Sequence, residues 1–172
     1  MAQLIPYLKK EEIENQIVSI AKKISADYSH GDLVIVGILK GCFIFISDLV
    51  RHLTVPVQID FISVSSYGSE TDSSGEIRMN KELQLDIKNK DVLLIDDIVD
   101  TGLTLSSISE YIRSFGPKSV RRCALIDKSE RREKSIALDY VCYKIKEGFL
   151  VGYGLDYAEK YRNLPGIYQL KL

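Results

Sequence analysis

The sequence has few cysteines and no excess of positive charge, and both shortages exclude classes of protein. The three cysteines, Cys42, Cys123 and Cys142, are isolated in apolar surroundings and share no spacing typical of a metal site. We therefore expect buried, reduced thiols, which are typical of cytoplasmic proteins. The formal net charge of -1 differs from the basic balance of a nucleic-acid-binding protein, so no nucleic-acid partner is expected.

Long apolar runs are also missing. No run reaches the roughly 18 residues that a membrane-spanning helix needs, and residues 1–10 lack the basic and apolar regions of a secretion signal. The sequence thus predicts neither a membrane partner nor secretion. The length of 172 residues, with 45% hydrophobic and 27% charged, fits one globular domain over residues 1–172.

Strand-like and helical patterns alternate along the chain. Apolar runs rich in β-branched residues predict strands that are covered on both faces, whereas strict alternation at 83–87 predicts a half-exposed strand. The predicted helices cover residues 10–29, 46–53 and 105–115. The predicted strands cover residues 33–39, 57–64, 83–87, 92–95, 120–126, 140–145, 149–153 and 167–170. This alternation predicts an α/β fold with a largely parallel sheet.

Two polar segments interrupt these patterns. Residues 65–81 hold five serines and two glycines, with Ile77 and Met79 as the only aliphatic residues. A loop this long inside a compact domain is usually functional or disordered, and we interpret it as a lid over a site. The run 128–132 is charged at every position but one and is typical of a solvated surface loop.

The stretch 92–105 carries the densest chemistry of the chain. An apolar run ends in Asp96 and Asp97, and Asp100, Thr101 and Gly102 follow before a helical pattern begins. Open α/β sheets bind ligands at the carboxyl ends of their strands. We therefore expect a ligand site here.

Two nucleotide-binding interpretations of this stretch are rejected. A nucleoside triphosphatase requires a loop that ends in Gly-Lys, and this dipeptide does not occur in the sequence. A dinucleotide-binding fold requires a third glycine after Gly152 and Gly154, and none follows at the required spacing. The remaining interpretation is a phosphate cradle from Asp100 to Thr104, where backbone amides and hydroxyls would meet the anion.

A phosphorylated sugar suits this cradle, because the neighbouring carboxylates of Asp96 and Asp97 can accept hydrogen bonds from sugar hydroxyls. The string 96–102 resembles the signature of the type I phosphoribosyltransferases. Three further segments, 39–41, 65–68 and 149–157 with Arg162 following, resemble the hypoxanthine-guanine phosphoribosyltransferases in their short bacterial form. The resemblance runs in order from about Val34 to Leu164.

The resemblance implies the type I phosphoribosyltransferase fold: a largely parallel central sheet flanked by helices, with a small hood and a mobile lid loop. It implies purine salvage, in which 5-phosphoribosyl-1-diphosphate and hypoxanthine or guanine give IMP or GMP and diphosphate. The implied cofactor is Mg²⁺, the implied substrates are small molecules, and the implied assembly is a homodimer or homotetramer.

The resemblance also implies a role for each matching residue. The ribose and its 5'-phosphate would be held by Asp96, Asp97, Asp100, Thr101, Gly102, Leu103 and Thr104. The diphosphate would be bound by Lys40, Gly41 and Arg162, and the lid would include Ser66 and Tyr67. The purine would be met by Lys128, Phe149, Leu150 and Asp156. Magnesium would be held by Asp156 and, through ribose or water, by Asp96 and Asp97; Asp100 would be the catalytic proton acceptor.

Two other functions share this fold. A pyrimidine-operon regulator with uracil phosphoribosyltransferase activity binds RNA and should present a basic face, which the pI near 6.1 does not support. A non-catalytic sensor of the sugar diphosphate would have no use for Asp100, Lys40 or the purine segment. Purine transfer therefore remains the leading interpretation.

Overall fold

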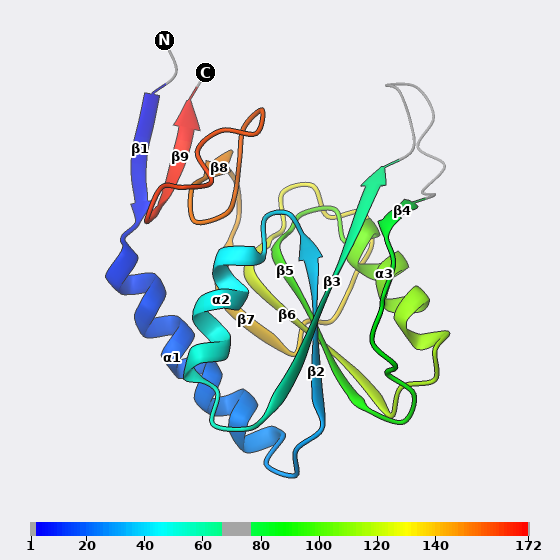
Figure 1. Ribbon diagram of the computed structural model, residues 1–172. Helices are drawn as coiled ribbons and strands as arrows, with labels where there is room; N and C mark the ends of the chain where they lie inside the picture. Colours follow the sequence, from blue (N-terminus) through cyan, green and yellow to red (C-terminus); the bar gives the residue numbers. More distant parts are fainter. Residues whose placement is uncertain (1–2, 67–76, 172) are drawn as a thin grey trace.

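The computed structural model describes residues 3–66 and 77–171, which form two sheets and three helices in that part of the chain (Figure 1). The elements in chain order are β1 (Gln3–Leu8), α1 (Lys10–Asp27), β2 (Leu33–Leu39), α2 (Phe43–His52), β3 (Val57–Ser66), β4 (Ile77–Lys81), β5 (Asp91–Val99), α3 (Leu103–Arg113), β6 (Ser119–Lys128), β7 (Tyr140–Ile145), β8 (Leu150–Val151) and β9 (Ile167–Lys171). None of the three helices is long and apolar enough to cross a membrane.

The larger sheet has the strand order β4-β3-β2-β5-β6-β7. Every neighbouring pair is parallel except β3 with β4, which is antiparallel at the edge. The chain first moves outward from β2 to β3 and then returns to β5 on the other side of β2. The order therefore reverses between β2 and β5, which is where open α/β sheets form ligand crevices.

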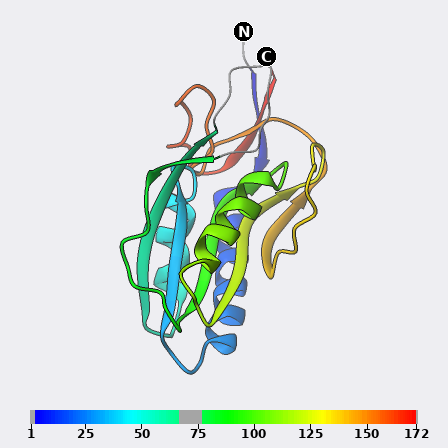
Figure 2. The same cartoon turned by 90° about the vertical axis from the view of Figure 1, so that its right-hand side faces the viewer.

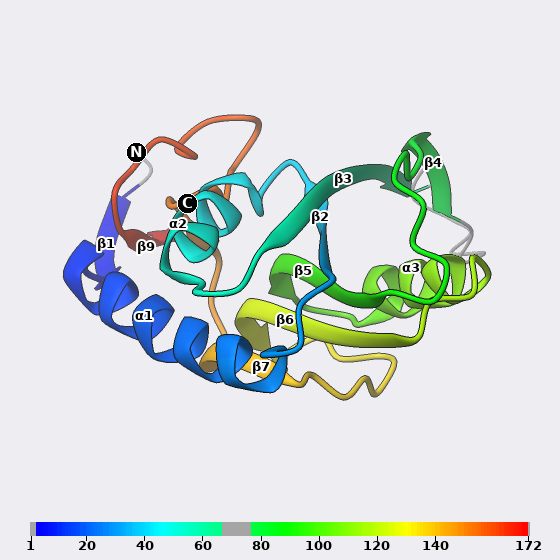
Figure 3. The same ribbon diagram turned by 60° about the horizontal axis from the view of Figure 1, so that its bottom comes forward.

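Helices cover both faces of this sheet, as Figures 2 and 3 show for α3 on one face and for α1 and α2 on the other. The side chains of β2 alternate between the two cores: Leu33 and Ile35 pack with α1 and α2, whereas Val34 and Val36 pack with α3. All four are fully buried. Strands buried on both faces read as continuous apolar runs, and the predicted α/β class is confirmed.

The smaller sheet, with the order β1-β9-β8, forms the hood above the carboxyl end of the main sheet (Figure 1). It joins the two ends of the chain, because β1 pairs antiparallel with β9. The sequence pattern does not predict a strand at β1. Its alternation is weak and Pro6 lies within it, so its strand conformation depends on a partner at the other end of the sequence.

The prediction of a strand at residues 83–87 is wrong. Leu83, Leu85 and Ile87 do point inward in alternation, but the amides of Gln84 and Leu85 donate to the buried carboxylate of Asp60 instead of to another strand. A strand pairs with β3 at Ile77–Lys81 instead, inside the segment expected to be a loop. Residues 83–87 thus show alternating burial without strand pairing, because the Asp60 side chain accepts the hydrogen bonds from the backbone amides of Gln84 and Leu85.

The lid prediction falls at the limit of the described residues. Ser66 is the last residue of β3, whereas Tyr67 and the following residues up to 76 lie outside the described part of the chain.

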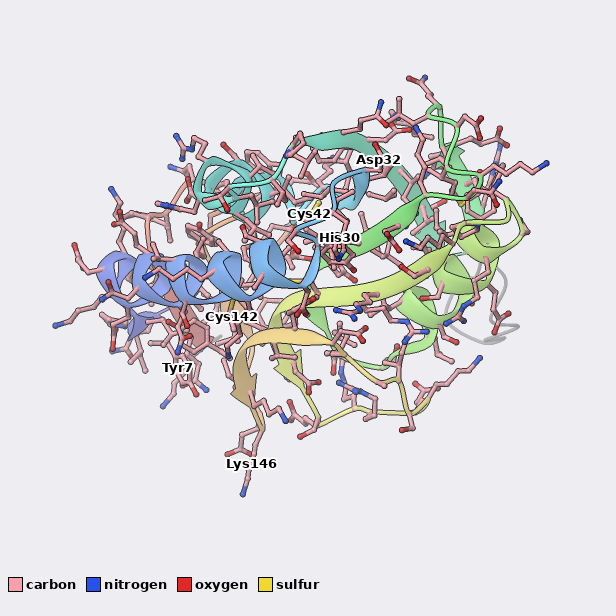
Figure 4. All side chains as sticks on the ribbon, turned by 90° about the horizontal axis from the view of Figure 1, so that it is seen from below. Tyr7, His30, Asp32, Cys42, Cys142 and Lys146 are labelled. Carbon is pink, nitrogen blue, oxygen red and sulfur yellow. The ribbon has the colours of Figure 1, made fainter. Side chains whose placement is uncertain are left out.

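Other boundaries differ in informative ways. The strand predicted at 149–153 is limited to Leu150–Val151, because Gly152 turns the chain with φ +96°. Phe115, which was placed on the apolar face of a helix, follows the end of α3 and is exposed. Cys42, Cys123 and Cys142 are free and buried, as predicted; in Figure 4, Cys42 and Cys142 lie among packed side chains, whereas Lys146 extends away from the molecule.

Replacing Asp60 with Ala should lower the free energy of unfolding by about 2 kcal/mol, because a buried carboxylate with several donors would be lost. Asp60 is 7% exposed. Burial alone would raise its pKa, but hydrogen bonds from the amides of Gln84, Leu85 and Phe61, and from Lys81, hold it below its usual value. Urea unfolding at pH 7 measures the difference.

Because the pKa is lowered on folding, this stabilisation is fully present above the unfolded-state pKa of about 3.9 and is lost as the pH falls through the folded-state pKa. The difference between wild type and Asp60→Ala should therefore shrink below about pH 4. Asp86→Ala is the control, since Asp86 is exposed and, among the described residues, accepts a hydrogen bond only from the nearby amide of Lys88. Equal losses in the two variants would contradict the role assigned to Asp60.

Candidate active site

A cavity of about 310 Å³ lies at the carboxyl ends of β2 and β5, where the strand order reverses. It is lined by Ile38, Leu39, Lys40, Gly41, Val64, Asp96, Asp97, Ile98, Val99, Asp100, Thr101, Gly102, Thr104 and Leu105. Most residues predicted to bind the sugar, its phosphate and the diphosphate therefore share one cavity. The parallel pairing of β2 with β5 explains this, because it brings their carboxyl ends to the same edge.

Two adjacent carboxylates line the cavity. Asp96 and Asp97 lie within β5 rather than beyond its end, since Ile98 and Val99 continue the pairing with β6. Burial, and then the charge of Asp97, raise the pKa of Asp96 well above its usual value; burial also raises the pKa of Asp97, against hydrogen bonds that lower it. Such a pair favours hydroxyl donors or a cation, either of which would offset the concentrated negative charge.

Gly102 begins α3 in the left-handed conformation, with φ +82°. The amide of Leu103 donates to Thr101 Oγ1 at 3.3 Å, and the other first amides of a helix have no acceptor within it. This is the geometry of an anion site at a helix N-terminus. Glycine is also needed at position 102 for a second reason, because a Cβ there would overlap the carbonyl of Lys134. The group that comes close to Gly102 is therefore a backbone carbonyl of the protein itself.

The predicted diphosphate residues converge from two distant parts of the chain. Lys40 follows a cis peptide bond after Leu39, and its Nζ lies 2.9 Å from a carboxylate oxygen of Glu159. Arg162 forms an ion pair with Asp156 at 2.8 Å and donates a hydrogen bond to Glu159 at 3.4 Å. Glu159, which the sequence analysis missed, thus contacts both cations.

The loop that follows β8 belongs to the hood, and it contacts residues 40–42 between β2 and α2, here called the Lys40 loop. A Cβ at Gly154 would overlap the carbonyl of Gly41, and a Cβ at Gly41 would overlap the carboxylate of Asp97. Two direct contacts therefore link three segments that are far apart in sequence, and each contact is possible because one of its residues is glycine. In the sequence, Gly154 matters only because its spacing excludes a dinucleotide-binding motif. Its contact with the carbonyl of Gly41 is visible only in the structure.

Of the four residues predicted to meet the purine, three lie at the end of β6 and the start of β8, and Asp156 lies beyond the end of β8. Lys128 is only 6% exposed, and its Nζ lies 3.1 Å from Glu130 and 3.7 Å from Asp100. Phe149 is 47% exposed and meets the ring of Tyr157 edge-on, with centroids 5.6 Å apart. Leu150 is buried in β8, next to Phe149.

Glu130 links these two parts of the site. Its carboxylate receives the Nζ of Lys128 and, at 3.3 Å, the amide of Gly148, which precedes Phe149. The hydrogen bond from Lys128 and then that from the Gly148 amide lower the pKa of Glu130. The expectation that residues 128–132 form a solvated surface is confirmed for Ser129, Glu130 and Arg131, which are exposed, but it is wrong for Lys128 and Arg132, which are largely covered. Only the tertiary arrangement supplies these partners.

A cation at this site would depend on oxygens from a substrate. The described residues contain no group of three or more His, Cys, Asp or Glu side chains that could hold a metal ion. Magnesium usually takes only one or two protein carboxylates and completes its shell with phosphate oxygens and water. The raised pKa values of Asp96 and Asp97 fit such a partial set.

Replacing Gly154 with Ala should lower stability by more than the same change at Gly31. Both glycines have positive φ, +100° and +84° respectively, but only Gly154 faces a backbone carbonyl at its Cβ position. Gly31→Ala measures the strain of the left-handed conformation alone, about 1 kcal/mol. Urea unfolding of both variants compares the losses, and equal losses would show that the hood and the Lys40 loop separate easily.

Comparison with known proteins connects this geometry to a family. The phosphoribosyl transferase domain family matches residues 6–158. The hypoxanthine-guanine phosphoribosyltransferase of Aquifex aeolicus (strain VF5) is 46% identical over 165 residues, which are 95% of this chain and 93% of that protein. That of Bacillus subtilis (strain 168) is 40% identical over 164 residues, which are 95% of this chain and 91% of that protein.

Solved structures agree with the sequence relatives. A hypoxanthine phosphoribosyltransferase from Staphylococcus aureus superposes with a TM-score of 0.93 at 46% identity, over 96% of this chain and 90% of that one. A hypoxanthine-guanine phosphoribosyltransferase from Bacillus anthracis gives the same TM-score at 36% identity, over the full length of both chains. The resemblance inferred from the sequence motifs is confirmed: the chain belongs to the hypoxanthine-guanine phosphoribosyltransferases of the phosphoribosyl transferase family.

Proposed function

We propose that the protein transfers the phosphoribosyl group of 5-phosphoribosyl-1-diphosphate to hypoxanthine or guanine, giving IMP or GMP and diphosphate, in purine salvage. The observation that carries this proposal is the shared cavity, where the carboxylates of Asp96 and Asp97 and the helix start at Gly102 lie beside Lys40. The relatives with this architecture are named hypoxanthine-guanine phosphoribosyltransferases. None of those described above is named as a pyrimidine-operon regulator, so that alternative gains no support.

In this proposal the sugar phosphate binds along the turn from β5 into α3. Asp96 and Asp97 accept hydrogen bonds from the ribose hydroxyls, which relieves the repulsion between two buried carboxylates. The amides and hydroxyls from Asp100 to Thr104 hold the 5'-phosphate at the helix N-terminus. Leu103 contributes its backbone amide, since its side chain is apolar.

The leaving group lies between the Lys40 loop and the hood. Lys40, the amide of Gly41 and Arg162 bind diphosphate in exchange for the carboxylates that they contact in the free protein. Magnesium, when bound, supplies positive charge at the departing diphosphate. Asp156, with Asp96 and Asp97 acting through ribose or water, would hold it. The two adjacent carboxylates of Asp96 and Asp97 support the magnesium assignment. The buried Nε of Arg162, which has no hydrogen-bond partner among the described residues, supports the diphosphate assignment, because this donor suits a phosphate oxygen.

The base is selected next to the cavity, by residues that do not line it but include Lys128, which lies close to Asp100. Lys128 donates to the 6-oxo group, Phe149 stacks on the ring, and the backbone at Leu150 and Asp156 meets the remaining edge. A purine carbonyl would then compete with Glu130 for the Nζ of Lys128. The exposed ring of Phe149 leaves a face open for stacking.

The reaction forms a bond from a purine ring nitrogen to the anomeric carbon, and breaks the bond from that carbon to diphosphate, which leaves with the electron pair. Positive charge builds on the sugar, so bound cations help chiefly at the leaving group. The ring nitrogen loses a proton to Asp100, directly or through the neighbouring ring nitrogen. The Oδ1 atom of Asp100 is buried and has no hydrogen-bond partner among the described residues.

Three further assignments remain proposals. We place the protein in the cytoplasm, which the three free, buried thiols support, and we treat residues 1–172 as one domain, which the pairing of β1 with β9 supports. A homodimer or homotetramer is proposed from the family, in which a Trypanosoma cruzi structure concerns the oligomeric state. Closure of a lid that includes Ser66 and Tyr67 stays a prediction.

The proposed function is tested by incubating the protein with magnesium, 5-phosphoribosyl-1-diphosphate and each nucleobase in turn, with diphosphate release as the readout. Hypoxanthine and guanine should be consumed, and adenine and uracil should not. Lys128→Ala should raise the KM for 6-oxopurines by about tenfold, since it removes a charged hydrogen bond. Consumption of uracil alone would favour the pyrimidine regulator.

Replacing Asp100 with Asn should lower kcat by about 100-fold, because a positioned proton acceptor typically contributes at least this much. The KM for 5-phosphoribosyl-1-diphosphate should change much less, since an amide keeps the shape of the loop. Steady-state kinetics separate the two quantities. Unchanged turnover would remove proton transfer from the role of Asp100.

A further inference from the structure

The loop that follows β6 is fastened to the loop that follows β5. Arg132 donates through Nε to the carbonyl of Asp100 at 2.8 Å and through its terminal nitrogen to the carbonyl of Val99 at 3.0 Å. The amides of Glu133 and Lys134 both donate to the carbonyl of Thr101 at 3.0 Å. Four hydrogen bonds therefore hold residues 132–134 against the turn that carries the proposed proton acceptor.

Within this fastened loop, the guanidinium of Arg131 reaches the carboxylate of Asp100. Its Nε and its terminal nitrogen both donate to Oδ2, at 3.0 and 2.6 Å. The other oxygen, Oδ1, is buried and has no hydrogen-bond partner among the described residues. The two oxygens of one carboxylate thus differ: one is held by a planar fork, and the other is left free at a cavity that Asp100 lines.

We propose that Arg131 is a positioning residue, which holds Oδ2 of Asp100 so that Oδ1 faces the purine as the proton acceptor. The inference rests on the proposed function, because it assumes that Asp100 accepts a proton. Arginine suits the task, since two of its donors in one rigid plane converge on Oδ2, whereas lysine offers a single point charge. Nothing in the sequence pattern identifies Arg131, which lies 31 positions from Asp100.

Without Arg131 the carboxylate has another partner nearby. The Nζ of Lys128 lies 3.7 Å from Oδ2, so the carboxylate can turn toward it and move Oδ1 out of place. Lys128 would then be less available to the purine as well. Misplacing a reacting group by about 1 Å can lower a rate by about 100-fold, whereas an exposed ion pair alters an equilibrium by less than about tenfold. Orientation therefore outweighs the electrostatic effect of the lost cation.

Steady-state kinetics of Arg131→Met, Arg131→Lys and Arg51→Met test the proposal. Arg51 is the matched control, because it pairs with Asp48 on α2 and its side chain is 68% exposed, against 69% for Arg131. We expect Arg131→Met to lower kcat by about tenfold, to leave the KM for 5-phosphoribosyl-1-diphosphate within about twofold, and to be partly rescued by Arg131→Lys. A kcat like that of Arg51→Met would overturn the inference.

A second measurement separates positioning from a general structural role. If Arg131 acts through Asp100, adding Arg131→Met to Asp100→Asn should lower kcat by less than about twofold further. The same tenfold loss in both backgrounds would show that Arg131 acts elsewhere and would overturn the inference. If Asp100→Asn lowers kcat while Arg131→Met does not, only this inference fails. If Asp100→Asn has no effect, the proton-transfer step fails, and the positioning role fails with it.

Discussion

The parallel pairing of β2 with β5 is the constraint on which the site depends. It aligns Leu33 with Asp91 and Gly37 with Ile95. The Lys40 loop and the turn at residues 100–102, which follow these two strands, therefore lie side by side. The chain needs the long excursion through α2, β3 and β4 to reach β5, because a parallel neighbour cannot be joined by a tight turn. The same reversal of strand order opens the cavity between the two loops.

Charge pairing inside the protein prepares this cavity before any substrate binds. Each cation that we assign to a substrate is matched by a carboxylate: Lys40 by Glu159, Arg162 by Asp156, and Lys128 by Glu130 and Asp100. The Lys40–Glu159 pair is exposed, and such a pair contributes little stability, so a phosphate can take its place at small cost. Lys128 and Arg162 are largely covered, and substrate oxygens would replace one set of acceptors around them with another, while the side chains remain close to their working positions.

Other features of the site oppose stability. Burial raises the pKa of Asp96 and of Asp97, so ionising them costs free energy. Ala158, Glu159 and Tyr161 adopt positive φ although none is glycine, and such backbone is strained. Two of these features reach the cavity, since Asp96 and Asp97 line it and Glu159 contacts Lys40, and unfavourable groups of this kind are common at functional sites. The two apolar cores on either face of the main sheet offset them.

Much of the molecule could be predicted from sequence. Continuous apolar runs identified β2, and a helical period identified α1, because local pattern and final environment agree there. The motif residues Asp96 to Gly102 and Lys40 are predicted to bind a sugar diphosphate; the structure places them around one cavity, and the family is confirmed. These features are encoded locally, in residue type and spacing.

Tertiary structure alone decided the rest. The strand β1 needed β9 as its partner, and residues 83–87 avoided strand pairing because Asp60 supplied acceptors from another element. Arg131 gained its contact with Asp100 only through the fastening of two loops. In each case the deciding hydrogen bonds join residues that are distant in sequence, so periodicity carries no trace of them. The sequence by itself determined the fold class, the family and the candidate site residues, whereas folding determined which side chains contact those residues.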